Sequence, residues 1–146
     1  GGIYTSAVEA ALKSNGYVVG VDVDQHYIGE KAIAENGYNP FVTSAMKGLY
    51  PATFDTLTDV IVNGNWEKYS GKIDTLGLVS ADDPAANYVQ IPMESTQWAD
   101  GKFTQDDYKT LVKAMFDGTL TVSNDITKAA KDFATVITVD DQGNIK

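Results

Sequence analysis

Residues 17–25 read YVVGVDVDQ, an apolar run that changes abruptly into acidic and polar side chains. Its aromatic and β-branched residues are typical of a buried strand, and two aspartates follow at the carboxyl end. Upstream, Ser6 and Glu9 fit a capping box at the start of an amphipathic helix, and Asn15-Gly16 provides its end. Helix followed by strand at this spacing predicts a βαβ unit whose first strand lies before residue 1.

The rest of the chain alternates in the same way. We expect strands at 41–44, 73–79, 88–91 and 135–139, a long helix over about 45–62, a helix between Thr104 and Gly118, a short helix near 126–133, and turns at 82–84 and 142–144. Residues 26–39 form an ambiguous connection with room for a short helix at 29–35. The order of elements predicts an α/β fold in which a Rossmann-like, mostly parallel sheet is flanked by helices.

The composition of the chain excludes several classes of ligand and of active site. The 146 residues suit one domain, and the net charge of −9 comes from 20 acidic residues and 11 basic ones, all lysine. Because the chain has no arginine and no lysine clusters, we expect no nucleic-acid partner, and phosphorylated ligands are disfavoured. The absence of cysteine excludes disulfides, thiolate zinc sites and a cysteine nucleophile. We expect neither a metal nor a cofactor.

Two side chains stand where ligands of α/β sheets bind. Asp22 follows the carboxyl end of the first strand, where it either accepts hydrogen bonds from a ligand or caps the next turn. Lys47 is expected in the first turn of the long helix, where a cation opposes the helix dipole and therefore needs a partner. That partner is a ligand or Asp22, and a freely solvated lysine is the alternative. We predict that the two side-chain termini lie within roughly 10 Å of each other.

An enzyme is the alternative from a different class. This alternative is a small α/β hydrolase or glycosidase-like enzyme that uses Asp22 and Asp24, although catalytic carboxylates converge in space and adjacency in the sequence does not indicate them. The sequence has no G-x-S-x-G motif, and His26, the single histidine, is expected to be an exposed loop residue. We therefore expect no catalytic residue.

Two motifs together resemble a known family. GVDVDQ at 20–25 and VTSAMK at 42–47 resemble the "GVDxDQ … TSxxK" pair of the basic membrane lipoprotein family, the substrate-binding proteins of nucleoside ABC transporters. The opening Gly1-Gly2 resembles the start of that family's Gly-rich loop, which commonly reads GGTGNG. LGL at 76–78 and FDG at 116–118 match weaker landmarks, in the order of the family's C-terminal half.

The resemblance implies the C-terminal lobe of a type I periplasmic-binding fold over 1–146, with the N-terminal lobe missing. Residues 45–64 are then expected to pack toward the absent lobe, and the chain by itself is expected to self-associate. The protein would be extracytoplasmic, lipid-anchored through its missing N-terminus, and would deliver a nucleoside-like solute to an ABC permease.

The resemblance also implies the residues of the ligand site. Asp22 and Lys47 would bind the solute, typically through ribose hydroxyls. Gly2, Ile3, Asp24 and Ser44 complete the expected ligand-binding set. Because Ile3 and Tyr4 are bulkier than the residues of the family's loop, they would narrow that side of the cleft.

Overall fold

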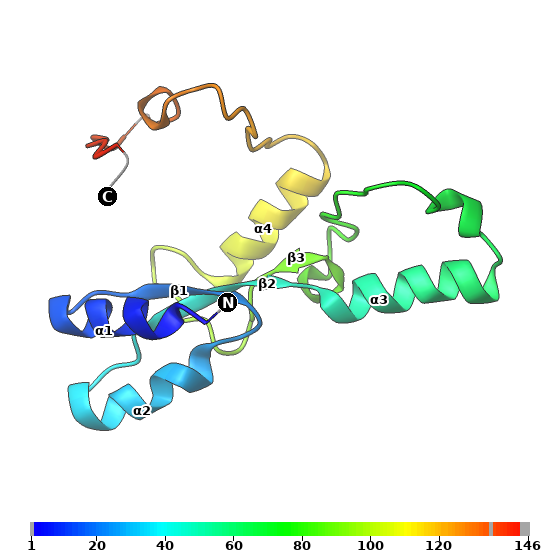
Figure 1. Ribbon diagram of the computed structural model, residues 1–146. Coiled ribbons are helices and arrows are strands. Elements are labelled where there is room, and N and C mark those ends of the chain that lie inside the picture. Colours follow the sequence, from blue (N-terminus) through cyan, green and yellow to red (C-terminus); the bar gives the residue numbers. More distant parts are fainter. Residues whose placement is uncertain (1, 135, 144–146) are drawn as a thin grey trace.

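The computed structural model describes residues 2–134 and 136–143 (Figure 1). Its regular elements are α1 (Tyr4–Ser14), β1 (Val18–Asp22), α2 (His26–Asn36), β2 (Phe41–Lys47), α3 (Leu49–Leu57) with a π-helical continuation (Thr58–Val62), β3 (Val89–Gln90) and α4 (Gln105–Phe116). Short 3₁₀ turns lie at Trp66–Lys68, Pro84–Ala86 and Ala130–Asp132.

The strands form one small mixed sheet in the order β1-β2-β3. β1 and β2 are parallel, with Asp22 opposite Met46, and β3 pairs antiparallel with the end of β2, placing Val89 opposite Lys47. The expected α/β class is therefore confirmed. The parallel part is limited to the β1–α2–β2 crossover.

Close packing between β1 and β2 fixes this crossover. Ser44 is fully buried and its hydroxyl accepts a hydrogen bond from the Gln25 backbone N–H at 3.0 Å. The Gln25 side chain in turn accepts from the Val21 N–H at 3.0 Å. A Cβ at Gly20 would collide with the side chains of both Ser44 and Gln25, so only glycine fits there.

The first two helices differ from the expectation at their starts. α1 begins at Tyr4 with Ile3 as its N-cap and no side-chain cap, so the capping box expected at Ser6 was wrong. Its end at Asn15, in the left-handed region with φ +53°, is confirmed. α2 spans the whole of His26–Asn36, with Gln25 as its N-cap and no side-chain cap. The Asp24 carboxylate accepts the His26 N–H at 3.0 Å in the turn that leads into the helix.

β2 is longer than expected and α3 begins later. The strand extends to Lys47 because its last residues pair with both β1 and β3. The helix expected from residue 45 therefore starts only at Leu49, after Gly48. Lys47 is a strand residue, and the expectation that it lies in a first helical turn was wrong.

Two expected strands do not form. Residues 73–79 are irregular, although buried Asn87 accepts the N–H groups of Val79 and Ser80 at 2.6 and 2.8 Å and ties them to the loop before β3. In the last segment, 136–139 is not a strand, and residue 135 lies outside the described residues. The helix expected near 126–133 is only a 3₁₀ turn. Asn144, the last residue of the turn expected at 142–144, also lies outside the described part.

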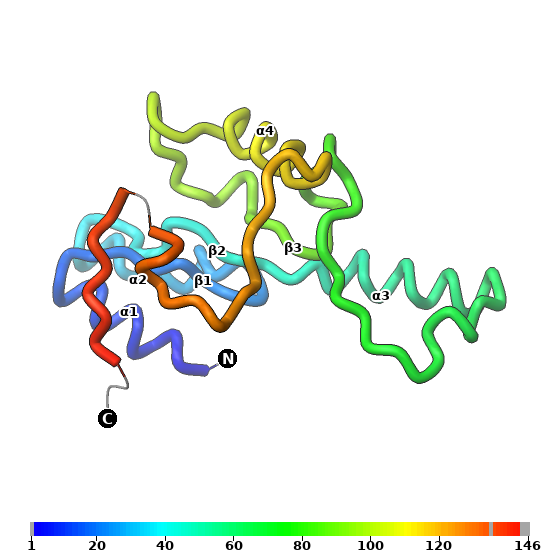
Figure 2. Tube along the Cα trace, turned by 90° about the horizontal axis from the view of Figure 1, so that it is seen from above, coloured from blue at the N-terminus to red at the C-terminus, as the bar shows by residue number. Residues whose placement is uncertain are grey.

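Helix α3 projects away from the sheet, whereas α1 and α2 lie along β1 and β2, and α4 lies beside β3 (Figures 1 and 2). No residue of α3 is buried. Five large apolar side chains, here called the α3 stripe, are between 51% and 78% exposed: Leu49, Tyr50, Phe54, Leu57 and Ile61. Tyr50 and Phe54 stack on each other with centroids 5.9 Å apart.

Candidate functional site

The carboxyl ends of β1 and β2 bring Asp22 and Lys47 together. The Lys47 Nζ lies 2.7 Å from Oδ1 of Asp22, which confirms the expected proximity. The register explains this contact, because Asp22 stands opposite Met46 and Lys47 is one residue further along the neighbouring parallel strand. The two side chains are 37% and 63% exposed, so a solute can reach both.

The backbone at Asp22 is unusual. Its φ of +74° is in the left-handed region, which few residues other than glycine adopt. The Val23 N–H donates to the Val21 carbonyl at 3.0 Å, so Asp22 is the central residue of a three-residue turn. Such γ-turns with positive φ are rare and strained, and strain of this kind is often found at functional sites. The turn ends the strand and presents the carboxylate at the sheet edge.

The charge of Asp22 is set by its neighbour. The hydrogen bond and ion pair from Lys47 hold the pKa of the Asp22 carboxyl below its usual value of 3.8. Asp22 is therefore an ionised acceptor at neutral pH. The Lys47 ammonium has three N–H donors, and one of them is directed at Asp22. The pair thus offers an acceptor and donors side by side.

Asp24 has a different role. Its Oδ1 accepts from the His26 N–H at 3.0 Å and its Oδ2 accepts from the Ser95 hydroxyl at 2.6 Å. These contacts stabilise the turn between β1 and α2 and attach Ser95 to it. Both carboxylate oxygens of Asp24 are therefore bonded to the protein itself, whereas the Asp22 carboxylate pairs with Lys47.

The other expected site residues do not take part in the Asp22–Lys47 ion pair. The Ser44 hydroxyl points into the β1–β2 packing, bonded to the Gln25 backbone, and has no exposed surface. Gly2 and Ile3 precede α1, whose first turn lies toward the carboxyl end of β1 (Figures 1 and 2). Ile3 is 83% exposed. Asp22 and Lys47 are the two expected site residues whose side chains form a direct ion pair in the described part of the chain.

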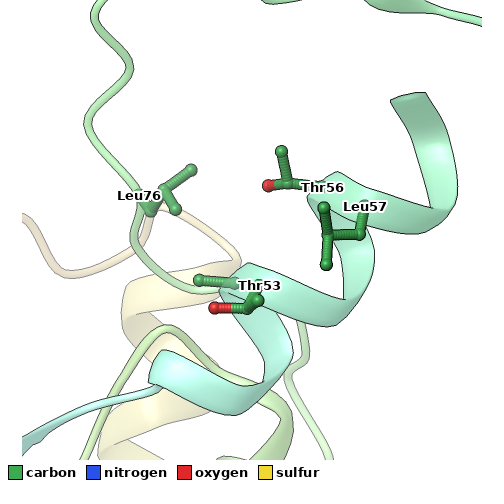
Figure 3. Close-up of a pocket in the computed structure, with 5 residues that line it drawn as sticks. Thr53, Thr56, Leu57 and Leu76 are labelled. Atoms are coloured by element: carbon green, nitrogen blue, oxygen red, sulfur yellow. The ribbon is translucent and has the colours of Figure 1, made fainter. Parts of the chain in front are cut away.

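The structure contains two cavities that were not expected from the sequence. One is a cavity of about 600 Å³ between the sheet and α4, with Lys47 among its lining residues. The other, of about 330 Å³, lies beside α3, where Leu76 faces Thr53, Thr56 and Leu57 across a gap (Figure 3). The larger cavity had one signal in the sequence, which is the helical spacing of the apolar residues Tyr108, Leu111, Val112 and Met115 on α4. Nothing in the sequence pointed to the second.

No family model, curated protein or solved structure matches this chain. Among the described residues, no group of three or more His, Cys, Asp or Glu side chains is placed to hold a metal ion. None of the helices in the described part has the length and hydropathy to cross a bilayer. The function must therefore be inferred from the geometry of the site.

Proposed function

We propose that this chain is the C-terminal lobe of a solute-binding protein and that Asp22 and Lys47 bind a nucleoside-like solute. The observation that carries the proposal is their ion pair, 2.7 Å long, at the carboxyl ends of adjacent parallel strands. Ligands of open α/β sheets bind at that edge. The strained backbone of Asp22 also supports the proposal, because strain of this kind is often retained where a side chain must be held in position for function.

The chemistry of the pair suits a vicinal diol. One ribose hydroxyl donates to the Asp22 carboxylate, and the other accepts from the Lys47 ammonium. A neutral solute also suits the rest of the chain, because the net charge is −9 and arginine is absent. Unphosphorylated nucleosides are therefore favoured over nucleotides.

The second lobe in this proposal covers α3. Apolar side chains of the α3 stripe are more than half exposed, as expected of a surface that packs on another domain. The solute would bind in the cleft between the two lobes, and closure of the cleft would present it to an ABC permease. Such a protein works outside the cytoplasm, held at the membrane by a lipid anchor.

Nucleoside titration tests the proposal. Adenosine, guanosine, uridine and the matching 5′-monophosphates are added to the chain, and shifts of backbone amides near Asp22 and Lys47 are followed by NMR. Because half of the cleft is contributed by the other lobe, we expect affinity on the order of millimolar for this chain by itself. The nucleosides should be recovered unchanged.

Two results would contradict the proposal. Tighter binding of the monophosphates would mean that the site selects anions. Conversion of any nucleoside to base and sugar would mean that the chain is an enzyme.

A further inference from the structure

The cavity between β2, β3 and α4 adjoins the sheet edge where the solute is proposed to bind, because Lys47 lies on both. Its volume is about 600 Å³, within the range of roughly 300–1,000 Å³ that small-molecule sites occupy. The walls are formed by Ala45, Met46, Lys47, Gly77, Leu78, Val89, Gln90, Ile91, Tyr108, Leu111, Val112 and Met115.

The interior of this cavity is apolar. Aliphatic and thioether side chains from β2 and α4 form its main walls, and Val112 is only 3% exposed. The Gln90 Nε2 donates to the Ala85 and Asn87 carbonyls at 3.0 and 2.7 Å, so its donors are used by the neighbouring loop. The Tyr108 hydroxyl accepts the Ile91 N–H at 3.3 Å. Lys47 therefore supplies the available charged donor on the lining.

The lining and the charge of the cavity favour an uncharged, mostly apolar occupant. The cavity opens to solvent, since Val89 is 50% exposed, and its mostly aliphatic lining favours an apolar body over a polar one. Anions are disfavoured because the Asp22 carboxylate lies 2.7 Å from the Lys47 ammonium and the chain carries a charge of −9. A neutral oxygen can still accept one of the remaining N–H groups of Lys47.

We infer that this cavity binds an uncharged, mostly apolar small molecule. Its aliphatic or aromatic body lies between β2 and α4, and a hydroxyl or carbonyl oxygen accepts a hydrogen bond from Lys47. The inference does not rest on nucleoside binding, which uses Asp22 as well and leaves the α4 wall untouched.

The three methionines of the chain make a direct test with 1-octanol as the probe. Met46 and Met115 line the cavity, whereas the Met93 carbonyl accepts from Trp98 Nε1 in the loop before α4. With methyl-labelled methionine, octanol should shift the Met46 and Met115 signals saturably and in parallel. The Met93 signal should stay in place and serves as the internal reference.

Filling the cavity should abolish this response. A Cβ built at Gly77 has no atom within 4 Å, and the backbone there has no positive φ, so a side chain can begin at this position without a clash, and Gly77→Phe adds a ring at the cavity wall. We expect at least a tenfold loss of octanol affinity. Ala45→Phe fills the same space from β2 and gives a second variant if the first does not fold. Leu57→Gln, which removes an apolar side chain of the α3 stripe, is the matched control and should bind as the parent does.

Lys47→Met tests the polar end of the occupant. Loss of a hydrogen bond from a charged donor should weaken octanol binding by about tenfold.

Three results would overturn the inference. The methionine shifts could stay linear up to the solubility limit of octanol, the Met93 signal could move as much as those of Met46 and Met115, or Gly77→Phe and Ala45→Phe could both bind octanol unchanged. Such results would mean that α4 closes onto the sheet in solution. Nucleoside shifts that persist in Gly77→Phe and disappear in Asp22→Ala would keep the two sites distinct.

Discussion

Lys47 and Asp22 join the carboxyl ends of two parallel strands through an ion pair of 2.7 Å between Nζ and Oδ1. Asp22 reaches this position from a backbone with φ +74°, whereas Lys47 extends a strand that pairs on both sides. The donor and the acceptor are therefore fixed by different parts of the sheet, and a change at either residue alters the same small surface.

The two nearby aspartates should respond differently to mutation. Asp22→Ala removes the exposed acceptor, and we expect nucleoside affinity to fall by about ten- to a hundredfold. Asp24→Ala removes the contacts to His26 N–H and the Ser95 hydroxyl, which hold the start of α2 but not the solute. Its affinity should stay within about threefold of the parent, because the contacts that are lost join parts of the protein and do not involve the solute. NMR titration measures both, and equal losses would assign the solute to the wrong carboxylate.

Asp59 should make the loop after α3 sensitive to acid. Its carboxylate accepts from Lys68 Nζ, the Tyr69 hydroxyl and Asn65 Nδ2, each at 2.7 Å. These bonds, that of Lys68 first, hold the pKa of Asp59 far below 3.8. Because the pKa is lowered on folding, the stabilisation is fully present above pH 3.8 and is lost as the pH falls through the folded-state pKa.

Asp59→Asn should therefore loosen residues 63–69 at neutral pH. We expect amide hydrogen exchange there to rise by about tenfold, with α4 unchanged, because the opening is local. Asp74→Asn, at an exposed position on the same connection, is the control. Equal exchange in both variants would show that the Asp59 hydrogen bonds do not hold the loop.

The capping box at the start of α4 should contribute measurably to the stability of the fold. The Asp107 N–H donates to the Thr104 hydroxyl oxygen at 3.3 Å, and the Thr104 N–H donates to Oδ2 of Asp107 at 2.8 Å. Thr104→Ala should lower the free energy of unfolding by about 1 kcal/mol. Thr110→Ala, an exposed change within the same helix, should have a much smaller effect in urea unfolding followed by circular dichroism. A similar cost at both positions would mean that the cap contributes nothing specific.

Local patterns predicted some local features. The end of α1 at Asn15, the start of α4 after Thr104 and the existence of a strand before Asp22 depend on nearby residues, and the structure confirms them. The capping box at Ser6 was wrong, and the strand is not buried as expected, since Val19 is 62% exposed. The end of β2 depends on β3, which is distant in sequence, so a helix was expected where the strand continues. Residues 73–79 have the composition of a strand but no strand partner.

The site was only partly predictable for the same reason. The expectation that Asp22 and Lys47 meet was correct, although Lys47 belongs to a strand and not to a helix start. The inward direction of Ser44 follows from its contact with the Gln25 backbone, a long-range pairing that the TSxxK motif does not reveal. The positive φ of Asp22 has no signature in composition or spacing.

The exposed apolar surface of α3 should make the chain self-associate. Leu49, Phe54 and Leu57 are 59%, 56% and 51% exposed on a helix with no buried residue. Complete burial of such a side chain contributes roughly 1.5–3 kcal/mol, so burying several of them can hold a dimer together. We therefore expect the average mass from light scattering to rise with protein concentration.

Polar substitution within the α3 stripe should reverse this association. The double variant Phe54→Gln, Leu57→Gln removes two adjacent contacts, and we expect the dimer dissociation constant to rise by at least tenfold. Ile73→Gln removes an apolar side chain that is fully exposed outside the stripe, so it controls for a general gain in solubility. Sedimentation equilibrium at several concentrations measures all three proteins. If the parent chain stays monomeric throughout, the α3 stripe does not drive association and its proposed packing on a second lobe loses its main support. If Ile73→Gln dissociates as readily as the double variant, association is a property of the whole apolar surface and α3 has no special part in it.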